Sequence, residues 1–133
     1  MPDSLLVVDD EKEILLAMRW ALEGSGYKIT TAATAEEAFR YFESMRPQAL
    51  LVDYKLPGAS GYEFLKWVRE MDPQVPIIIV TGLTSQIEAI EAICRDFSAF
   101  ACLRKPVRSE ELVETVRKAL LSGTQPPLIR QAA

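Results

Sequence analysis

The chain has 133 residues, a formal net charge of −4, and a composition that is 49% hydrophobic and 26% charged. These values fit one globular domain with its own core and leave no room for a second domain of ordinary size. The acidic balance argues against direct nucleic-acid binding, which needs an excess of lysine and arginine. The absence of histidine excludes serine–histidine catalysis and histidine metal ligands.

Five short apolar runs alternate with segments of helical periodicity. The runs are bounded by turn residues and predict strands at 5–8, 27–30, 49–52, 77–80 and 99–103. Each segment between or after them carries one apolar stripe at helical spacing. This α/β alternation, with near-continuous apolar strands, predicts a parallel sheet that helices cover on both sides.

Several predicted helices carry end signals. Gly24 and Gly26 follow the first helix, and Thr34 and Glu37 have the spacing of a capping box at the start of the second. The prolines that end later helices are Pro47, Pro73 and Pro76.

The C-terminal stretch SGTQPPLIRQAA breaks the helical pattern. Gly123 suits the position after a helix, and the prolines that follow favour a linker or a loose tail. We therefore divide the chain into a domain over 1–121 and a tail over 122–133. Two interpretations of the tail stay open: a disordered end, or the start of a linker to an output domain that this chain lacks.

The terminal and cysteine patterns indicate the compartment. The stretch MPDSLLVVDDEKE has a short apolar run without a basic flank, so we expect no signal peptide, no membrane contact and a cytoplasmic protein. The spacing of Cys94 and Cys102 fits neither a redox pair nor a zinc site. We expect two buried free thiols.

Charged or hydroxyl-bearing residues follow four of the five predicted strands. In open parallel sheets, sites form beyond the carboxyl ends of the strands. The residues there are Asp9, Asp10, Asp53, Thr81 and Lys105. Taken singly, each has an ordinary explanation as a helix N-cap, a turn residue or a solvated side chain. Their joint position at one edge favours a functional site.

Three carboxylates at this edge need positive charge. Two unit charges about 4 Å apart repel by about 4 kcal/mol at an effective dielectric constant of about 20. Lys105 supplies one positive charge, and a divalent cation with oxygen ligands would supply two more. Mg²⁺ (or Mn²⁺) suits such a site, because it binds one or two carboxylates together with water and a phosphate oxygen. A carboxylate beside the cation could attack phosphorus, which predicts phosphoryl transfer to Asp53.

Four motifs resemble the receiver domain of two-component response regulators. They are VVDDE at 7–11, VDYKLPGASGYE at 52–63, VTG at 80–82 and LRKP at 103–106. The resemblance extends over about residues 4–121. It implies a flavodoxin-like, doubly wound (βα)5 fold with a five-stranded parallel sheet in the order 2-1-3-4-5.

The resemblance also implies a role for each site residue. Asp53 is similar to the phosphoacceptor, and magnesium would be held by the carboxylates of Asp9, Asp10 and Asp53 and by the backbone carbonyl of Lys55. Thr81 is similar to the switch hydroxyl of the family, and Lys105 to the lysine that contacts the phosphoryl group. The peptide bond from Lys105 to Pro106 is commonly cis in this family.

Two positions depart from the family pattern. The switch aromatic usually lies three residues before the lysine, where this chain has Cys102. Phe100 would point to the same face of a regular strand, which makes it a candidate substitute. Lys55 adds positive charge two residues after the phosphoacceptor, with an effect on the phosphoryl lifetime whose direction the sequence does not give.

The implied function is a regulatory module that transforms no metabolite. It would accept a phosphoryl group on Asp53 from a sensor histidine kinase or a histidine phosphotransfer protein, and would switch conformation to control an output domain or partner. It would catalyse only its own phosphorylation and dephosphorylation. The fourth helix, fifth strand and fifth helix would form a partner or homodimer surface. Ordinary core packing is the alternative for their apolar residues: Ile87, Ile90, Ile93, Phe97, Phe100 and Val113.

Other functions are weaker hypotheses. A phosphatase of the haloacid dehalogenase type would need a second acid where this chain has Lys55, and its nucleophile would follow the first strand. A nucleotide site is disfavoured, because the loop DDEKE lacks glycine and would repel phosphates. A receiver-like interaction domain that is never phosphorylated is a third hypothesis, against which the intact acidic set argues.

Overall fold

The computed structural model describes residues 3–54, 61–82 and 87–122. Strands and helices alternate along this part of the chain. In order they are β1 (Ser4–Val8), α1 (Lys12–Glu23), β2 (Lys28–Ala32), α2 (Ala35–Met45), β3 (Ala49–Asp53), α3 (Gly61–Met71), β4 (Ile77–Thr81), α4 (Ile87–Asp96), β5 (Ala101–Arg104) and α5 (Ser109–Ser122).

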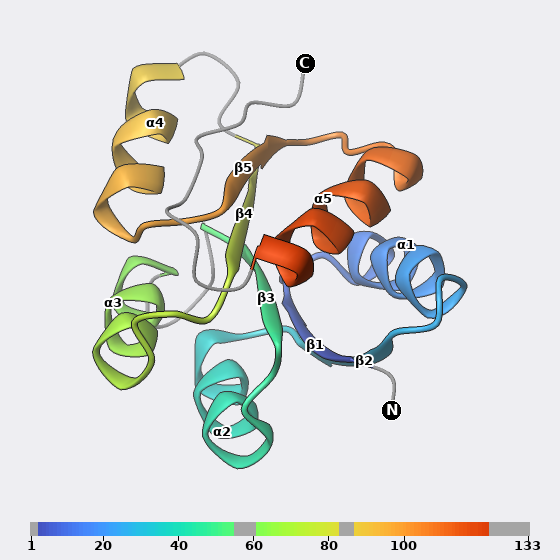
Figure 1. The fold of residues 1–133 in the computed structure, drawn as a ribbon, viewed down its shortest axis with the longest axis horizontal. Coiled ribbons are helices and arrows are strands. Elements are labelled where there is room, and N and C mark those ends of the chain that lie inside the picture. The colour runs from blue at the N-terminus through green and yellow to red at the C-terminus, as the bar shows by residue number, and fades with distance from the viewer. Residues whose placement is uncertain (1–2, 55–60, 83–86, 123–133) are drawn as a thin grey trace.

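The five strands form one parallel sheet in the order β2-β1-β3-β4-β5. Helices α1 and α5 cover one face, and α2, α3 and α4 cover the other (Figure 1). The predicted fold and strand order are therefore confirmed. Every residue of β3 and β4 is buried, as expected for strands that have helices on both faces.

Side-chain alternation along the strands divides the core into two layers. The layer under α2–α4 contains Leu6, Val8, Leu50, Val52, Ile77 and Ile79. The layer under α1 and α5 contains Leu5, Val7, Leu51, Ile78 and Val80. The sheet thereby has two apolar faces, which its helices bury.

The predicted capping box is present at the start of α2. The hydroxyl oxygen of Thr34 accepts a hydrogen bond from the backbone N–H of Glu37 at 3.2 Å. The Glu37 carboxylate accepts in return from the N–H of Ala33 at 3.0 Å, one residue earlier than the usual reciprocal bond. The helix ends at Met45, and the C-cap residue Arg46 has a positive φ of 48° and precedes Pro47.

The start of β5 differs from the prediction. The strand begins at Ala101, not at position 99, because a turn with Ser98 at a φ of 50° precedes it. Phe100 therefore does not share a face with Cys102: Phe100 packs in the layer under α1 and α5, and Cys102 in the layer under α2–α4. The prediction that Phe100 and Cys102 share a face was wrong, which removes the reason to consider Phe100 as a substitute for the switch aromatic.

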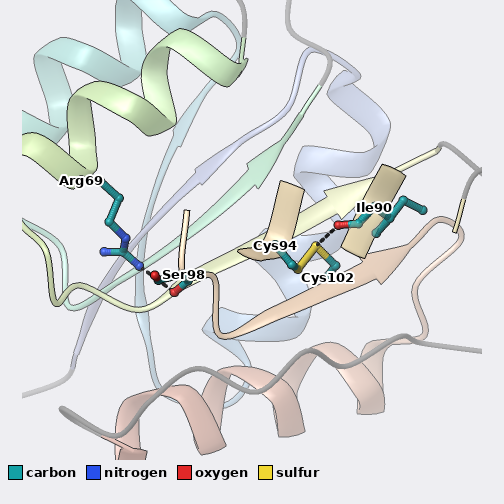
Figure 2. Close-up of a disulfide and its surroundings, with 5 residues drawn as sticks. All are labelled: Arg69, Ile90, Cys94, Ser98 and Cys102. Carbon is teal, nitrogen blue, oxygen red and sulfur yellow. Dashed lines mark hydrogen bonds between the residues drawn. A yellow bond between two sulfur atoms is a disulfide. The ribbon is translucent and has the colours of Figure 1, made fainter. Parts of the chain in front are cut away.

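The two cysteines are buried as predicted, but they are not free. Cys94 on α4 and Cys102 on β5 form a disulfide, with their Cα atoms 6.3 Å apart (Figure 2). A separation of eight residues suffices here because the chain turns back on itself between the helix and the strand. The prediction of free thiols was wrong.

Arg69 on α3 holds that turn in place. Its guanidinium donates to the backbone carbonyl oxygen of Phe97 at 2.6 Å. It also donates to that of Ser98 at 3.1 Å (Figure 2). It also donates to the carbonyl oxygens of Val75 at 2.7 Å and Asp72 at 3.2 Å. One side chain thereby joins the end of α3, the loop before β4 and the turn before β5.

Several apolar residues considered for a partner surface belong to the core. Ile90, Phe97 and Phe100 are buried, and Ile93 and Val113 are partly buried against the core. The side chain of Ile87 lies outside the described part of the structure. Among the described residues, no helix combines the length and hydrophobicity that crossing a bilayer requires.

The Arg69 contacts predict a large effect of Arg69→Ala. Loss of the guanidinium leaves several carbonyl oxygens without their charged donor, and we expect the free energy of unfolding to fall by about 2–4 kcal/mol. Urea denaturation measures this change. Arg40→Ala removes an exposed arginine on α2 and should change stability by less than about 0.5 kcal/mol. Equal effects of the two substitutions would contradict the role of Arg69.

Candidate functional site

The register of the sheet brings two aspartates together. In the parallel pair β1–β3, Val8 lies opposite Val52. The next residue on each strand is an aspartate, so Asp9 and Asp53 lie side by side at the carboxyl edge of the sheet. Both are buried, with exposures of 0% and 5%. Burial of two like charges at one place indicates that another group compensates them.

Two exposed acids complete this cluster. Asp9, Asp10, Glu11 and Asp53 each offer a carboxylate oxygen, and these oxygens all lie within 4.8 Å of one another. The three predicted aspartates are therefore grouped as expected. Glu11 was not predicted as a member, and its only sequence signal is its place as the third consecutive acid after β1.

Lys105 supplies positive charge to the cluster. Its ammonium nitrogen lies 2.8 Å from Asp9 Oδ2, 3.1 Å from Asp53 Oδ2 and 3.4 Å from Glu11 Oε1. Burial alone would lower the pKa of this ammonium, but hydrogen bonds and charges from Asp9 and Asp53 outweigh burial and raise the pKa. Lys105 is therefore a protonated cation at neutral pH, shared between two buried carboxylates.

Asp9 is not an ordinary helix cap. The N-cap residue of α1 is Glu11, and Asp9 Oδ1 accepts the backbone N–H of Glu11 at 2.9 Å. Asp9 Oδ2 is fully buried and accepts no well-aligned hydrogen bond from the described residues, although it is ion-paired with Lys105. That oxygen therefore has a lone pair with which it could bind a cation in the acidic cluster.

The donor set fits a hard divalent cation. All the grouped ligand atoms are carboxylate oxygens, and one of them, Asp9 Oδ2, lacks a well-aligned hydrogen bond. Oxygen-only sites with several carboxylates suit Mg²⁺ or Mn²⁺ better than softer metals. The predicted carbonyl ligand, Lys55, lies outside the described residues.

Thr81 and the end of β5 border the same edge. Val80 lies opposite Asp53 in the β3–β4 pair, so Thr81 follows one residue beyond it. Thr81 is 1% exposed, and its carbonyl oxygen accepts the backbone N–H of Lys105 at 2.8 Å. The peptide bond between Lys105 and Pro106 is cis, as predicted. The structure thus places every described candidate residue at one edge of the sheet.

Gly61 holds the beginning of α3 close to the end of β3. A Cβ atom at position 61 would overlap the carbonyl group of Tyr54, the residue after Asp53. Only glycine permits this backbone approach. The requirement lay within the quoted motif but was not predicted, because spacing alone does not show which glycine faces another backbone.

Comparisons with known proteins identify the family. The sequence profile of the response regulator receiver domain matches residues 5–117. The chain belongs to the response regulator receiver family. It is 33% identical to the response regulator MprA of Mycolicibacterium vanbaalenii over 126 residues, which are 95% of this chain and 53% of that protein. It is 30% identical to the alkaline phosphatase synthesis transcriptional regulatory protein PhoP of Bacillus subtilis, over 90% of this chain and 49% of that protein.

Solved structures agree with this assignment. A CheY-like receiver domain protein from Methanospirillum hungatei has a TM-score of 0.84 and 32% identity, and the match covers 92% of this chain and 96% of that one. The chemotaxis response regulator CheY4 of Vibrio cholerae has a TM-score of 0.81 and 28% identity, over 90% and 99% of the two chains.

The chain is a receiver domain of two-component signal transduction, and the receiver family is regulatory. The hypothesis of a haloacid dehalogenase-type phosphatase does not hold for a member of this family. The chain spans about half the length of the curated relatives it matches.

The ion-pair geometry predicts that Lys105→Met destabilises the fold. The substitution leaves two buried carboxylates without their cation, and we expect the free energy of unfolding to fall by about 3 kcal/mol. Chemical denaturation at pH 7 measures the loss. Lys118→Met removes an exposed ion pair on α5 and should change stability by less than about 0.5 kcal/mol.

The stability difference between wild type and Lys105→Met should also depend on pH. An unfolded lysine has a pKa near 10.5, and the folded pKa of Lys105 is higher. The stabilisation is therefore complete below about pH 10 and is lost as the pH rises through the folded pKa. The stability difference between wild type and Lys105→Met should stay constant from about pH 7 to about pH 10 and shrink above that range. A difference that stays constant as the pH rises well above about 10 would contradict this assignment.

Proposed function

We propose that Asp53 accepts a phosphoryl group and that this modification switches the domain. The observation that carries the proposal is the position of Asp53: it ends a buried strand inside a cluster of carboxylate oxygens, with the Lys105 ammonium 3.1 Å away. The carboxylate is thus held by a cation at the sheet edge where the family places its phosphorylation site. Asp9 and Asp10, with Asp53 and the backbone carbonyl of Lys55, would hold Mg²⁺ or Mn²⁺.

The chemistry is an in-line displacement at phosphorus. A carboxylate oxygen of Asp53 attacks, a P–O bond forms, and the bond from phosphorus to the donor breaks, with the electron pair leaving on the donor. The donor would be a phosphohistidine of a sensor histidine kinase or a histidine phosphotransfer protein, the partners expected for a receiver domain. When bound, the divalent cation supplies neutralisation of the phosphoryl oxygens.

Lys105 changes partners in this scheme. Its ammonium pairs with Asp9 and Asp53 before the reaction. Phosphorylation attaches a phosphoryl group of higher charge to one Asp53 oxygen, and this group attracts the ammonium outward. Thr81 would donate its hydroxyl hydrogen to a phosphoryl oxygen. These differential contacts shift the population toward a second arrangement of the segments that follow β3 and β4.

Partners follow from the family and from the length of its members. We propose a cytoplasmic protein in which residues 122–133 begin a linker to an output domain, because the curated relatives are about twice as long as the matched region. The receiver domain 1–121 would act on that output, or on a second copy of itself, through α4, β5 and α5. It would make no direct contact with nucleic acid or membrane.

The decisive test of phosphorylation uses a small-molecule donor. Incubation with acetyl phosphate and Mg²⁺ should add one phosphoryl mass to the intact chain, and peptide mapping should place it on Asp53. Asp53→Asn should abolish the added mass. Asp96→Asn, an exposed aspartate at the end of α4, should leave it unchanged. An unmodified wild-type chain would instead favour an interaction domain that is never phosphorylated.

The metal site predicts stabilisation by Mg²⁺. Binding to the folded state should raise the melting temperature in proportion to the logarithm of the metal concentration, and EDTA should reverse the rise. Asp9→Asn and Asp10→Asn each remove one charged ligand and should weaken Mg²⁺ binding by at least about tenfold. Glu43→Gln, an exposed acid on α2, serves as the control. Equal Mg²⁺ affinity in all four proteins would exclude the cluster as the metal site.

A further inference from the structure

The disulfide between α4 and β5 lies outside the acidic cluster and has no part in the phosphoryl chemistry. Cys94 lies on the buried stripe of α4, next to Ile90 and Phe97, and Cys102 lies inside β5 (Figure 2). The two residues are 1% and 0% exposed, and the chain has no other cysteine. The covalent bond therefore joins a helix to the strand that it covers.

Backbone hydrogen bonds also connect the segments that carry these two positions. Cys102 lies opposite Ile79 in the β4–β5 pair. The N–H of Ala99 donates to the carbonyl oxygen of Cys94 at 2.9 Å, and Arg69 holds the carbonyl groups of the turn between them. Two thiols at these positions would stay close together, which gives a high effective concentration for closing the bond again.

The reduced state also has a polar partner available. Cys102 Sγ lies 3.7 Å from the carbonyl oxygen of Ile90, the contact drawn as a dashed line in Figure 2. A disulfide sulfur carries no hydrogen and cannot donate. A thiol at the same place can donate weakly to that oxygen. A Cys102 thiol would therefore have a polar partner after the disulfide is broken.

We propose that Cys94 and Cys102 form a reversible thiol–disulfide exchange site that locks α4 onto β5 when oxidised and releases it when reduced. The exchange partners are small disulfides and thiols of the glutathione class. An external thiolate attacks one of the two sulfurs, and the other cysteine leaves as a thiolate that then takes up a proton. A second external thiol attacks the resulting mixed disulfide and releases the second cysteine as a thiol. In sum, the protein gains two electrons and two protons, and two external thiols become one disulfide.

The lock bears on the switch because of where β5 lies. Cys102 is three residues before Lys105, whose N–H binds the carbonyl oxygen of Thr81. A bond from α4 to β5 restricts any movement of α4 relative to this strand. This step rests on the proposed function. The cytoplasmic location is also part of that proposal, and it favours a reversible bond, because thiols there are kept reduced and a permanent structural disulfide is rare.

Burial of both sulfurs sets how the exchange proceeds. A thiol reagent reaches them only when α4 moves away from β5, so exchange measures that opening. If phosphorylation favours an arrangement in which α4 has moved away from β5, it also favours reduction of the disulfide. By linkage, oxidation disfavours phosphorylation to the same extent. Phosphorylation and reduction should therefore promote each other.

The first experiment tests the exchange site alone. The full chain is equilibrated at graded ratios of oxidised to reduced glutathione, and its free thiols are alkylated. Mass spectrometry of the intact protein then gives the number of alkylated cysteines. We expect one two-electron transition between a dithiol and an intramolecular disulfide. Cys94→Ala and Cys94→Ser should both abolish it, which guards against a folding defect in either variant. Thiols that never pair, or a bond that persists in reduced glutathione alone, would overturn the proposal.

The second experiment tests the lock. Amide hydrogen exchange is measured in α4 for oxidised and reduced protein, with and without acetyl phosphate and Mg²⁺, while intact mass reports phosphorylation in each sample. We expect exchange in α4 to be at least about tenfold slower in the oxidised protein, and the difference to vanish in Cys94→Ala. Phosphorylated protein with equal α4 exchange in both redox states would overturn the lock. Absence of phosphorylation in both states would overturn the proposed function, and the redox difference in α4 would still decide the lock.

Discussion

The Lys105 ammonium between Asp9 and Asp53 is the interaction on which the site depends. Sheet register forces the two carboxylates together, and both are buried. The lysine comes from the end of β5, which β4 separates from β3 in the sheet, so its side chain crosses the end of β4 to reach them. A single cation thereby connects the ends of β1, β3 and β5. Any change of charge at Asp53 must act on β5, because its neutralising group is anchored there.

The short strand β5 connects two kinds of chemistry. Its four residues run from Ala101 to Arg104. Cys102 within the strand is bonded to α4, and Lys105 directly after it is paired with the acidic cluster. The backbone of Lys105 is also bound to Thr81 at the end of β4. The ion pairs at the sheet edge and the disulfide under α4 therefore involve residues of β5 and its end that lie only a few positions apart.

Periodicity predicted the alternating strands and helices, and the rule that strand ends share one edge predicted which residues meet there. The strand order and the roles of these residues came from the resemblance to receiver domains. Side-chain detail required the structure. Glu11 is exposed, so no hydrophobic pattern marked it as a cluster member. Phe100 was misplaced because alternation was extended over residues 99 and 100, which lie between the turn at Ser98 and the start of β5 at Ala101. The disulfide was missed because familiar cysteine spacings describe motifs within one segment, whereas Cys94 and Cys102 meet through a turn that Arg69 holds from another helix.

The backbone contact between Tyr54 and Gly61 has a consequence for how such domains diversify. The chain leaves the end of β3 and returns to the same point before α3 begins. A loop whose two ends touch can gain or lose residues at little entropic expense, since closure depends only weakly on length. Any side chain at position 61 would push the strand and the helix apart. Variation at this point of the fold is thus restricted, because the residue that closes the contact has to be glycine.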